Sequence, residues 1–343
     1  MVASPATILD VAKLARVSPS TVTHALNGKR PVSRETRDRI VSAINTLGYI
    51  PSHSASHLRK GTSGIIGCYA LDITEAFASK IVKGIEQGLV GSDLSMLFVS
   101  GVEFGNDFLK AFQFLLRHNI DGLLLCHHIP TMLQSVGTLK NAGLPVISIN
   151  MELDGIKSIF PDNLNGGIIA ADHLYASGMR CPAMICGPET RISSRLRFAG
   201  FKKRIDELGL NFPYSRFIYG DYSYEHGYNA AFQLVEGESN IDGICCANDY
   251  IAAGAINRLT AMGYKIPEDI RIIGYDNRDF SEFWPIPIST FEHPLEEMGF
   301  FGISALQCEL RSGIIDMEPQ ILQPKLIPRT STTGVRVPDT DLQ

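Results

Sequence analysis

Residues 6–51 read ATILDVAKLARVSPSTVTHALNGKRPVSRETRDRIVSAINTLGYIP, and their local chemistry decides how the first part of the chain folds. Thr7 stands three residues before Asp10, which is the spacing of a capping box, and an apolar stripe follows. Ser18 is a good N-cap, and Pro19 occupies a first helical position, where its missing N–H does no harm. The short segment between these two helices predicts the tight angle of a helix-turn-helix.

Apolar spacing predicts a third helix and the faces that the helices bury. Ser33 is expected to cap the third helix and Gly48 to end it. In the second helix, Val22, Ala25 and Leu26 are expected to face the other helices. In the third helix, the apolar residues that repeat at helical spacing are Ile40, Val41, Ile44 and Leu47. The polar residues expected to point outward near the start of the second helix are Pro19, Ser20, Thr21 and His24. A recognition helix reads base edges with this end, whereas an ordinary three-helix bundle would only expose it to solvent.

The charge distribution favours the DNA-reading alternative. Residues 1–60 hold nine Lys or Arg and three acids, a net charge of +6. The whole chain has a net charge of −5, so residues 61–343 carry −11. This asymmetry indicates a polyanionic partner for the basic segment.

The motif T-I-x-D-V-A-x-x-A-x-V-S-x-x-T-V-x-H-x-L-N-G, followed by V-S-x-x-T-R-x-R-I and L-G-Y-x-P, resembles the lactose-repressor family of bacterial transcription regulators. The resemblance extends to about residue 333. It implies a homodimer that binds a near-palindromic operator through Thr7, Ser18, Pro19, Ser20, Thr21, Thr23, His24 and Asn27. Thr23 replaces a more usual Ser, and a phosphate contact is still expected there.

The resemblance also implies a short hinge helix after the third helix. Leu58 matches a residue that wedges into the minor groove at a central base step and bends the duplex. Ser56 stands where Arg is common and Ser54 where an apolar residue is common. Both changes lower helix propensity, so we expect weaker or more ligand-dependent folding of the hinge.

From residue 65 the pattern changes to short apolar runs that alternate with helix-length segments. The runs are bounded by Gly, Pro, Asn or Asp, as expected for strands buried on both faces of a parallel sheet. The expected strands are Ile65–Ala70, Ser95–Ser100, Gly122–Cys126, Pro145–Ile149, Ala183–Cys186, Gly243–Ala247 and Ile270–Tyr275. About 270 residues in this rhythm suggest two sheet domains rather than one.

The resemblance gives the arrangement of these strands. It implies an α/β core like a periplasmic sugar-binding protein, with two doubly wound parallel-sheet subdomains joined by crossovers near residues 162, 290 and 321. We expect a helix-turn-helix headpiece over 1–50, a hinge helix and linker over 51–64, an effector-binding and dimerisation core over 65–333, and a disordered tail over 334–343. The first subdomain is expected over about 65–162 and 291–320, and the second over about 163–290 and 321–333.

In such a core, ligand binds between the subdomains at the carboxyl ends of the strands. Arg197, Asn248 and Asp276 match effector-contacting positions of the family, and an Arg beside a carboxylate and an amide suits sugar hydroxyls. Phe77 and Tyr222 are candidate stacking aromatics. The further candidate is Asn150, which stands where sugar responders often carry Asp. Because Asp276 is shared by sugar and purine binders, a purine or another co-repressing metabolite remains the alternative to a sugar.

Other functions lack support in the sequence. Seven cysteines lie mostly in expected strands and no secretory segment is recognised, so we expect buried thiols in a cytoplasmic protein. No cofactor is expected, Cys126-His127-His128 lacks a second metal-ligand cluster, and no apolar run reaches membrane-spanning length. An enzyme would need a nucleophile or base motif, which is not found, and a solute-binding protein would have no use for residues 1–60. The sequence therefore favours a ligand-responsive transcriptional repressor.

Overall fold

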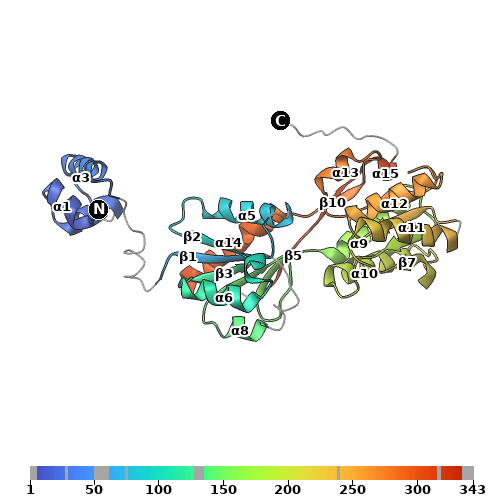
Figure 1. Cartoon of the computed structure of the whole chain (residues 1–343), viewed down its shortest axis with the longest axis horizontal. Coiled ribbons are helices and arrows are strands. Elements are labelled where there is room, and N and C mark those ends of the chain that lie inside the picture. Colours follow the sequence, from blue (N-terminus) through green and yellow to red (C-terminus); the bar gives the residue numbers. More distant parts are fainter. Residues whose placement is uncertain are drawn as a thin grey trace.

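The computed structural model describes residues 6–27, 30–49, 62–73, 76–126, 135–237, 240–314 and 318–333. Their helices and strands form a small helical headpiece followed by two lobes, each built on a parallel sheet (Figure 1). The fold class predicted from the sequence is confirmed. Among the described residues, no helix combines the length and the apolar character that crossing a membrane requires.

The headpiece contains the three predicted helices α1 (Ile8–Ala15), α2 (Pro19–Asn27) and α3 (Arg34–Leu47). Thr7 and Asp10 form the capping box: the Thr7 amide donates to Asp10 Oδ2 at 2.9 Å, and the Asp10 amide donates to Thr7 Oγ1 at 3.4 Å. Ser33 caps α3 through the Thr36 amide, and Gly48 ends it in a left-handed conformation. The buried core consists of Val11, Ala12, Ala15, Val22, Ile40 and Ala43.

One predicted core position of the headpiece, Leu26, is wrong, and one residue of the apolar repeat in the third helix, Val41, lies outside the core. The side chain of Leu26 is 40% exposed and that of Val41 is 50% exposed. Ala43 is buried instead. Helical spacing identifies an apolar stripe, but a three-helix domain this small can only cover the middle of that stripe.

The first lobe is a six-stranded parallel sheet in the order β11-β5-β4-β3-β1-β2. Its strands are β1 (Ile65–Ala70), β2 (Ser95–Ser100), β3 (Gly122–Leu125), β4 (Val146–Ile149), β5 (Lys157–Pro161) and β11 (Gln320–Leu322). One face is covered by α5 (Ala76–Leu89) and α14 (Leu295–Ser312), and the other by α6 (Phe108–Arg117) and α8 (Val136–Lys140). A 3-10 turn, η1 (Gly101–Phe104), follows β2.

The second lobe is a four-stranded parallel sheet in the order β7-β6-β8-β9. Its strands are β6 (Pro182–Ile185), β7 (Phe217–Ile218), β8 (Gly243–Cys246) and β9 (Arg271–Ile273). One face is covered by α9 (Asn163–Ala176) and α10 (Ile192–Glu207), and the other by α11 (Tyr224–Gly237) and α12 (Asp249–Ala261). Shorter elements are η2 (Tyr214–Arg216), α13 (Asp279–Phe283) and α15 (Thr330–Thr333).

The chain passes between the lobes three times. The first passage runs from β5 to α9. The second runs from β10 (Thr290–Glu292) to α14, and the third runs from β11 to β12 (Lys325–Ile327). The strands β10 and β12 pair in antiparallel orientation. Figure 1 shows β10 between the lobes. The strand β11 pairs with β5, so the first sheet extends to Leu322, beyond the boundary at 320 expected from the sequence.

The helices α9 and α10 pack closely enough to fix the residues on them. A side chain at Gly167 would overlap the carbonyl of Arg197, and one at Gly200 would overlap the carbonyl of Leu164. Two glycines therefore let the backbones touch, and this contact holds Arg197 against the start of α9.

Five of the seven cysteines are buried, and none is in a disulfide. Burial raises the pKa of Cys245 to about 12, so the thiol stays protonated and unreactive at neutral pH. Cys308 departs from the expected buried thiols, because it lies exposed on α14.

Candidate functional site

Arg197 is the centre of a buried polar cluster in the second lobe. It lies on α10, and only 6% of its surface is exposed. Its Nε donates to Asn163 Oδ1 at 2.9 Å and its Nη1 to the carbonyl of Ala247 at 2.6 Å. Its Cζ lies 3.6 Å from the centroid of the Tyr275 ring, so the guanidinium stacks on an aromatic face. These contacts fix the guanidinium plane at the carboxyl ends of the strands.

Asp276 follows β9 and meets this guanidinium. Its Oδ1 lies 3.6 Å from Arg197 Nη1 and 3.2 Å from His293 Nε2. Burial on its own would raise the pKa of Asp276, but the hydrogen bond with His293 and the charge of Arg197 outweigh it, and the pKa lies below its ordinary value. Asp276 is therefore an ionised carboxylate beside a fixed cation.

His293 completes the cluster and was missed by the sequence reasoning. Its Nε2 lies 3.1 Å from Arg197 Nη2 as well as 3.2 Å from Asp276 Oδ1, and its Nδ1 is buried with no hydrogen-bond partner among the described residues. Burial lowers its pKa, although Asp276 acts in the opposite direction, so the ring is neutral at pH 7. His293 lies between β10 and α14 with no motif around it. Only the tertiary fold therefore places it in the cluster.

Asn248 and Tyr222 extend the site along the strand ends. Asn248 caps α12, with its Oδ1 accepting from the Ile251 amide at 2.9 Å and its Nδ2 donating to the carbonyl of Tyr222 at 3.2 Å. The Tyr222 hydroxyl lies 3.3 Å from Ser193 Oγ. Because Ala247 binds Arg197 and directly precedes Asn248, these two predicted residues join the same cluster.

The first lobe supplies the remaining two predicted residues. The Phe77 ring, on α5, makes an edge contact with His293, with 5.5 Å between the centroids. Asn150 follows β4 in a left-handed conformation, and its amide donates to the carbonyl of Ile159 in its own sheet. The structure thus brings five of the six predicted ligand residues together, and Asn150 remains at the strand end of the other sheet.

The predicted DNA-contacting residues lie at the start of α1 and along α2. Ser18 Oγ accepts from the Thr21 amide at 3.2 Å, and Thr23 Oγ1 donates to the carbonyl of Pro19 at 3.0 Å. Ser20 is exposed near the start of α2, and His24 is partly exposed one turn later. Asn27 ends α2, and Leu58, like Ser54 and Ser56, lies outside the described residues.

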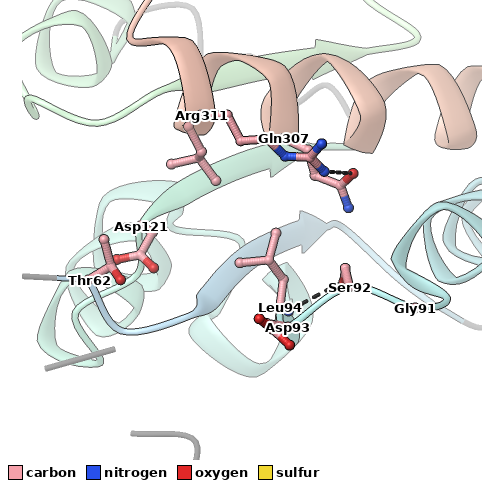
Figure 2. A pocket seen from close by; sticks show the side chains of 9 residues that line it. Thr62, Gly91, Ser92, Asp93, Leu94, Asp121, Gln307 and Arg311 are labelled. Carbon is pink, nitrogen blue, oxygen red and sulfur yellow. Dashed lines mark hydrogen bonds between the residues drawn. The ribbon is translucent and has the colours of Figure 1, made fainter. Parts of the chain in front are cut away.

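Figure 2 shows a recess at the amino end of the first sheet, opposite to the carboxyl ends of its strands. Its lining includes Thr62, Asp121, Gln307 and Arg311. Here Asp121 accepts from the Ser63 amide at 2.8 Å and from the Gly64 amide at 2.6 Å. The recess lies where the described core begins, so it marks the exit toward the headpiece and not the predicted ligand site.

Two family models match separate segments of the chain. Residues 7–52 match bacterial regulatory proteins of the lacI family, and residues 171–332 match a periplasmic binding protein-like domain. The chain is 29% identical to the HTH-type transcriptional repressor PurR of Haemophilus influenzae, over 96% of this chain and 99% of the relative. It is also 29% identical to the ribose operon repressor of Escherichia coli, over 95% and 99%.

Solved structures agree with these matches. The lac repressor dimer bound to operator and the anti-inducer ONPF is 28% identical, with a TM-score of 0.78 over 96% of this chain and 99% of that one. The complex of the transcriptional regulator CelR with cellobiose is 26% identical, with a TM-score of 0.69 over 95% and 99%.

Proposed function

The chain belongs to the lacI family of bacterial regulatory proteins, and on this basis we propose that it is a transcriptional repressor whose operator affinity is set by a small molecule. The observation that carries the proposal is the pairing of a basic helix-turn-helix with a buried Arg197–Asp276–His293 cluster in a binding-protein-like lobe. A DNA reader alone would not need such a cluster, and a solute-binding protein would not need the headpiece.

The chemistry of the cluster favours a polyhydroxylated ligand. The Asp276 carboxylate accepts hydrogen bonds from hydroxyls, and the guanidinium of Arg197 donates in a fixed fork. The Asn248 amide lies beside them. We therefore propose a sugar as the effector.

A purine is the second candidate. The Phe77 ring lies against His293, and Tyr222 is held beside the cluster by the hydrogen bond from Asn248 to its backbone carbonyl. Aromatic faces stack on nucleobases as well as on sugars. The similarity to the repressor PurR supports this candidate.

On the DNA side, we propose that a homodimer presents two α2 helices to the half-sites of a near-palindromic operator. The +6 charge of residues 1–60 supplies the electrostatic attraction, and Ser20 and His24 supply base contacts. Leu58 is proposed to wedge into the minor groove at the operator centre. Such a protein acts in the cytoplasm and is not an enzyme.

The two sites are coupled through the passages between the lobes. Arg197 binds Asn163 just after the first passage and His293 just before α14. A ligand that moves either residue changes the angle between the lobes, and therefore the spacing of the two linkers in the dimer. We propose induction, in which the ligand releases the operator.

A thermal-shift screen of the full-length protein with D-ribose, cellobiose, hypoxanthine and phosphorylated sugars tests the effector class, because a ligand that binds the native state raises its melting temperature. We expect one class to stabilise the protein and to change the anisotropy of operator DNA in the same solution. Stabilisation without any change in operator binding would contradict the repressor mechanism.

A further inference from the structure

The turn that carries Asp276 is strained. Asp276 has φ of 100° and Asn277 has φ of 46°, so two successive non-glycine residues lie in the left-handed region. Each such conformation is unfavourable and persists only where surrounding contacts determine it. The contacts that hold this turn therefore control where the Asp276 carboxylate points.

Three successive amides of the turn are each held by a hydrogen bond. The Asp276 amide donates to the carbonyl of Phe291 at 2.9 Å, and the Asn277 amide donates to Thr290 Oγ1 at 3.2 Å. The Arg278 amide donates to Asp249 Oδ2 at 2.8 Å. Two of the three anchors are thus side chains from other elements.

Asp249 and Thr290 act as one unit. The Thr290 hydroxyl donates to Asp249 Oδ1 at 2.6 Å, and both residues are fully buried. Burial raises the pKa of Asp249 to about 7, which the hydrogen bonds from Thr290 and Arg278 oppose. A side chain at Gly274 would collide with Asp249 Oδ1, so the chain keeps space for this carboxyl group. A buried acid in a space left clear for it indicates a role that an apolar residue would not fill.

We propose that Asp249, together with Thr290, is the positioning residue of the effector site. It holds the turn over 276–278 so that the Asp276 carboxylate faces Arg197 and His293. Asp249 does not contact the effector, because it is fully buried and each of its carboxylate oxygens already accepts a hydrogen bond. This inference rests on the proposed effector site.

The neighbouring residues Thr290 and Ser289 give a matched pair of variants. Thr290→Val removes the hydroxyl that links Asp249 to Asn277 and keeps the shape of the side chain. Ser289→Ala removes another buried hydroxyl, which contacts Arg329 and Thr332 instead of the turn. Thr290→Ser restores the hydroxyl, and Asp249→Asn tests the carboxylate directly.

The imidazole ¹⁵N shifts of His293 provide a readout that needs no ligand, since its Nε2 contacts Asp276. We expect these shifts to change in Thr290→Val and Asp249→Asn and to keep their wild-type values in Thr290→Ser and Ser289→Ala. His226, which contacts the carbonyl of Cys186, serves as the control signal. Unchanged His293 shifts in both Thr290→Val and Asp249→Asn, in folded protein, would overturn the positioning role.

Calorimetric titration with D-ribose, cellobiose and hypoxanthine adds the functional readout. For the probe that binds wild type, we expect affinity to fall about tenfold in Thr290→Val and Asp249→Asn, since a buried donor and acceptor lose their partners. Affinity should recover in Thr290→Ser. Equal affinity in all variants would reject the positioning role of Asp249 but leave the effector site standing. If no probe binds wild type, the proposed effectors are contradicted. The His293 shifts would then still decide the positioning role.

Discussion

The two lobes share one structural feature, an aspartate before a strand that binds the backbone amides at the start of the neighbouring strand. In the first lobe Ile120-Asp121-Gly122 leads into β3, and in the second Ile241-Asp242-Gly243 leads into β8. Asp121 accepts from the amides of the two residues before β1, and Asp242 accepts from those of Arg180 and Cys181, the two residues before β6. Each aspartate therefore clasps the start of the neighbouring strand.

The difference lies in what the clasped segment joins. The residues held by Asp121 follow the linker to the headpiece, whereas those held by Asp242 only follow α9. The carboxyl ends of the two sheets also differ, because the charged residues Arg197 and Asp276 both belong to the second lobe. We propose that the second lobe is specialised for the ligand and the first for the connection to DNA.

The largest effect is expected from the charged cluster. Arg197→Ala leaves Asn163 Oδ1 without its donor and Asp276 without its cation. Removing one member of a buried ion pair costs about 3–5 kcal/mol. We expect ligand affinity to fall by about a hundredfold or more while operator binding persists. Lys110→Ala, at an exposed position on α6 of the first lobe, is the control and should retain most of the affinity. Calorimetry on both variants makes the comparison, and a normal titration of Arg197→Ala would contradict it.

A pH dependence of stability is expected from Asp249 in the second lobe. Because the pKa of Asp249 is about 7 in the native protein and near 3.8 when unfolded, the native state binds more protons between these values. The free energy of unfolding contributed by Asp249 therefore falls as pH rises from about 4 to about 7, by roughly 2–4 kcal/mol. Asp276, with a lowered pKa, contributes stability that is lost only below that window.

Denaturant titrations of wild type and Asp249→Asn at several pH values measure this slope. The variant should show a flatter, less negative dependence between pH 4 and pH 7. Identical slopes would mean that Asp249 has an ordinary pKa in the native state.

The paired clasps give a smaller and more selective effect. Asp121→Asn and Asp242→Asn should each lower the free energy of unfolding by about 1–2 kcal/mol, since hydrogen bonds to a charged group weaken. Only Asp121→Asn should also weaken operator binding, by about tenfold, because the linker leaves the core with more conformational freedom. Operator titrations by anisotropy distinguish the two, and equal operator affinity would show that the clasp is a structural repeat alone.

The most local effect concerns base preference. His24→Ala should relax the preference at one base pair of each half-site, at a cost of about 1–3 kcal/mol for the preferred sequence, and leave ligand affinity unchanged. Selection of binding sites from random DNA measures it. A uniform loss across all sequences would instead indicate a phosphate contact.

The parts of the fold fixed by local chemistry were predictable, and those fixed by tertiary placement were not. The caps at Thr7, Ser33 and Gly48 and the strands β1 and β2 follow from neighbouring residues and were found. The strands β5, β7, β10, β11 and β12 were missed, since most are three residues or fewer and lack an apolar run of their own. Arg197 and Asp276 were predicted through the resemblance, but His293 comes from a passage between the lobes and carries no local signal.

The central claim is that the cluster in the second lobe controls the DNA affinity of the headpiece. The most direct measurement is the operator dissociation constant of wild type and of Arg197→Ala, each with and without a saturating concentration of the compound that stabilises wild type in the thermal-shift screen. We predict that the compound changes the constant of wild type by about 5- to 150-fold, the usual range of coupling between sites, and leaves that of Arg197→Ala unchanged. An equal response in both proteins, or no response in wild type, would contradict the account.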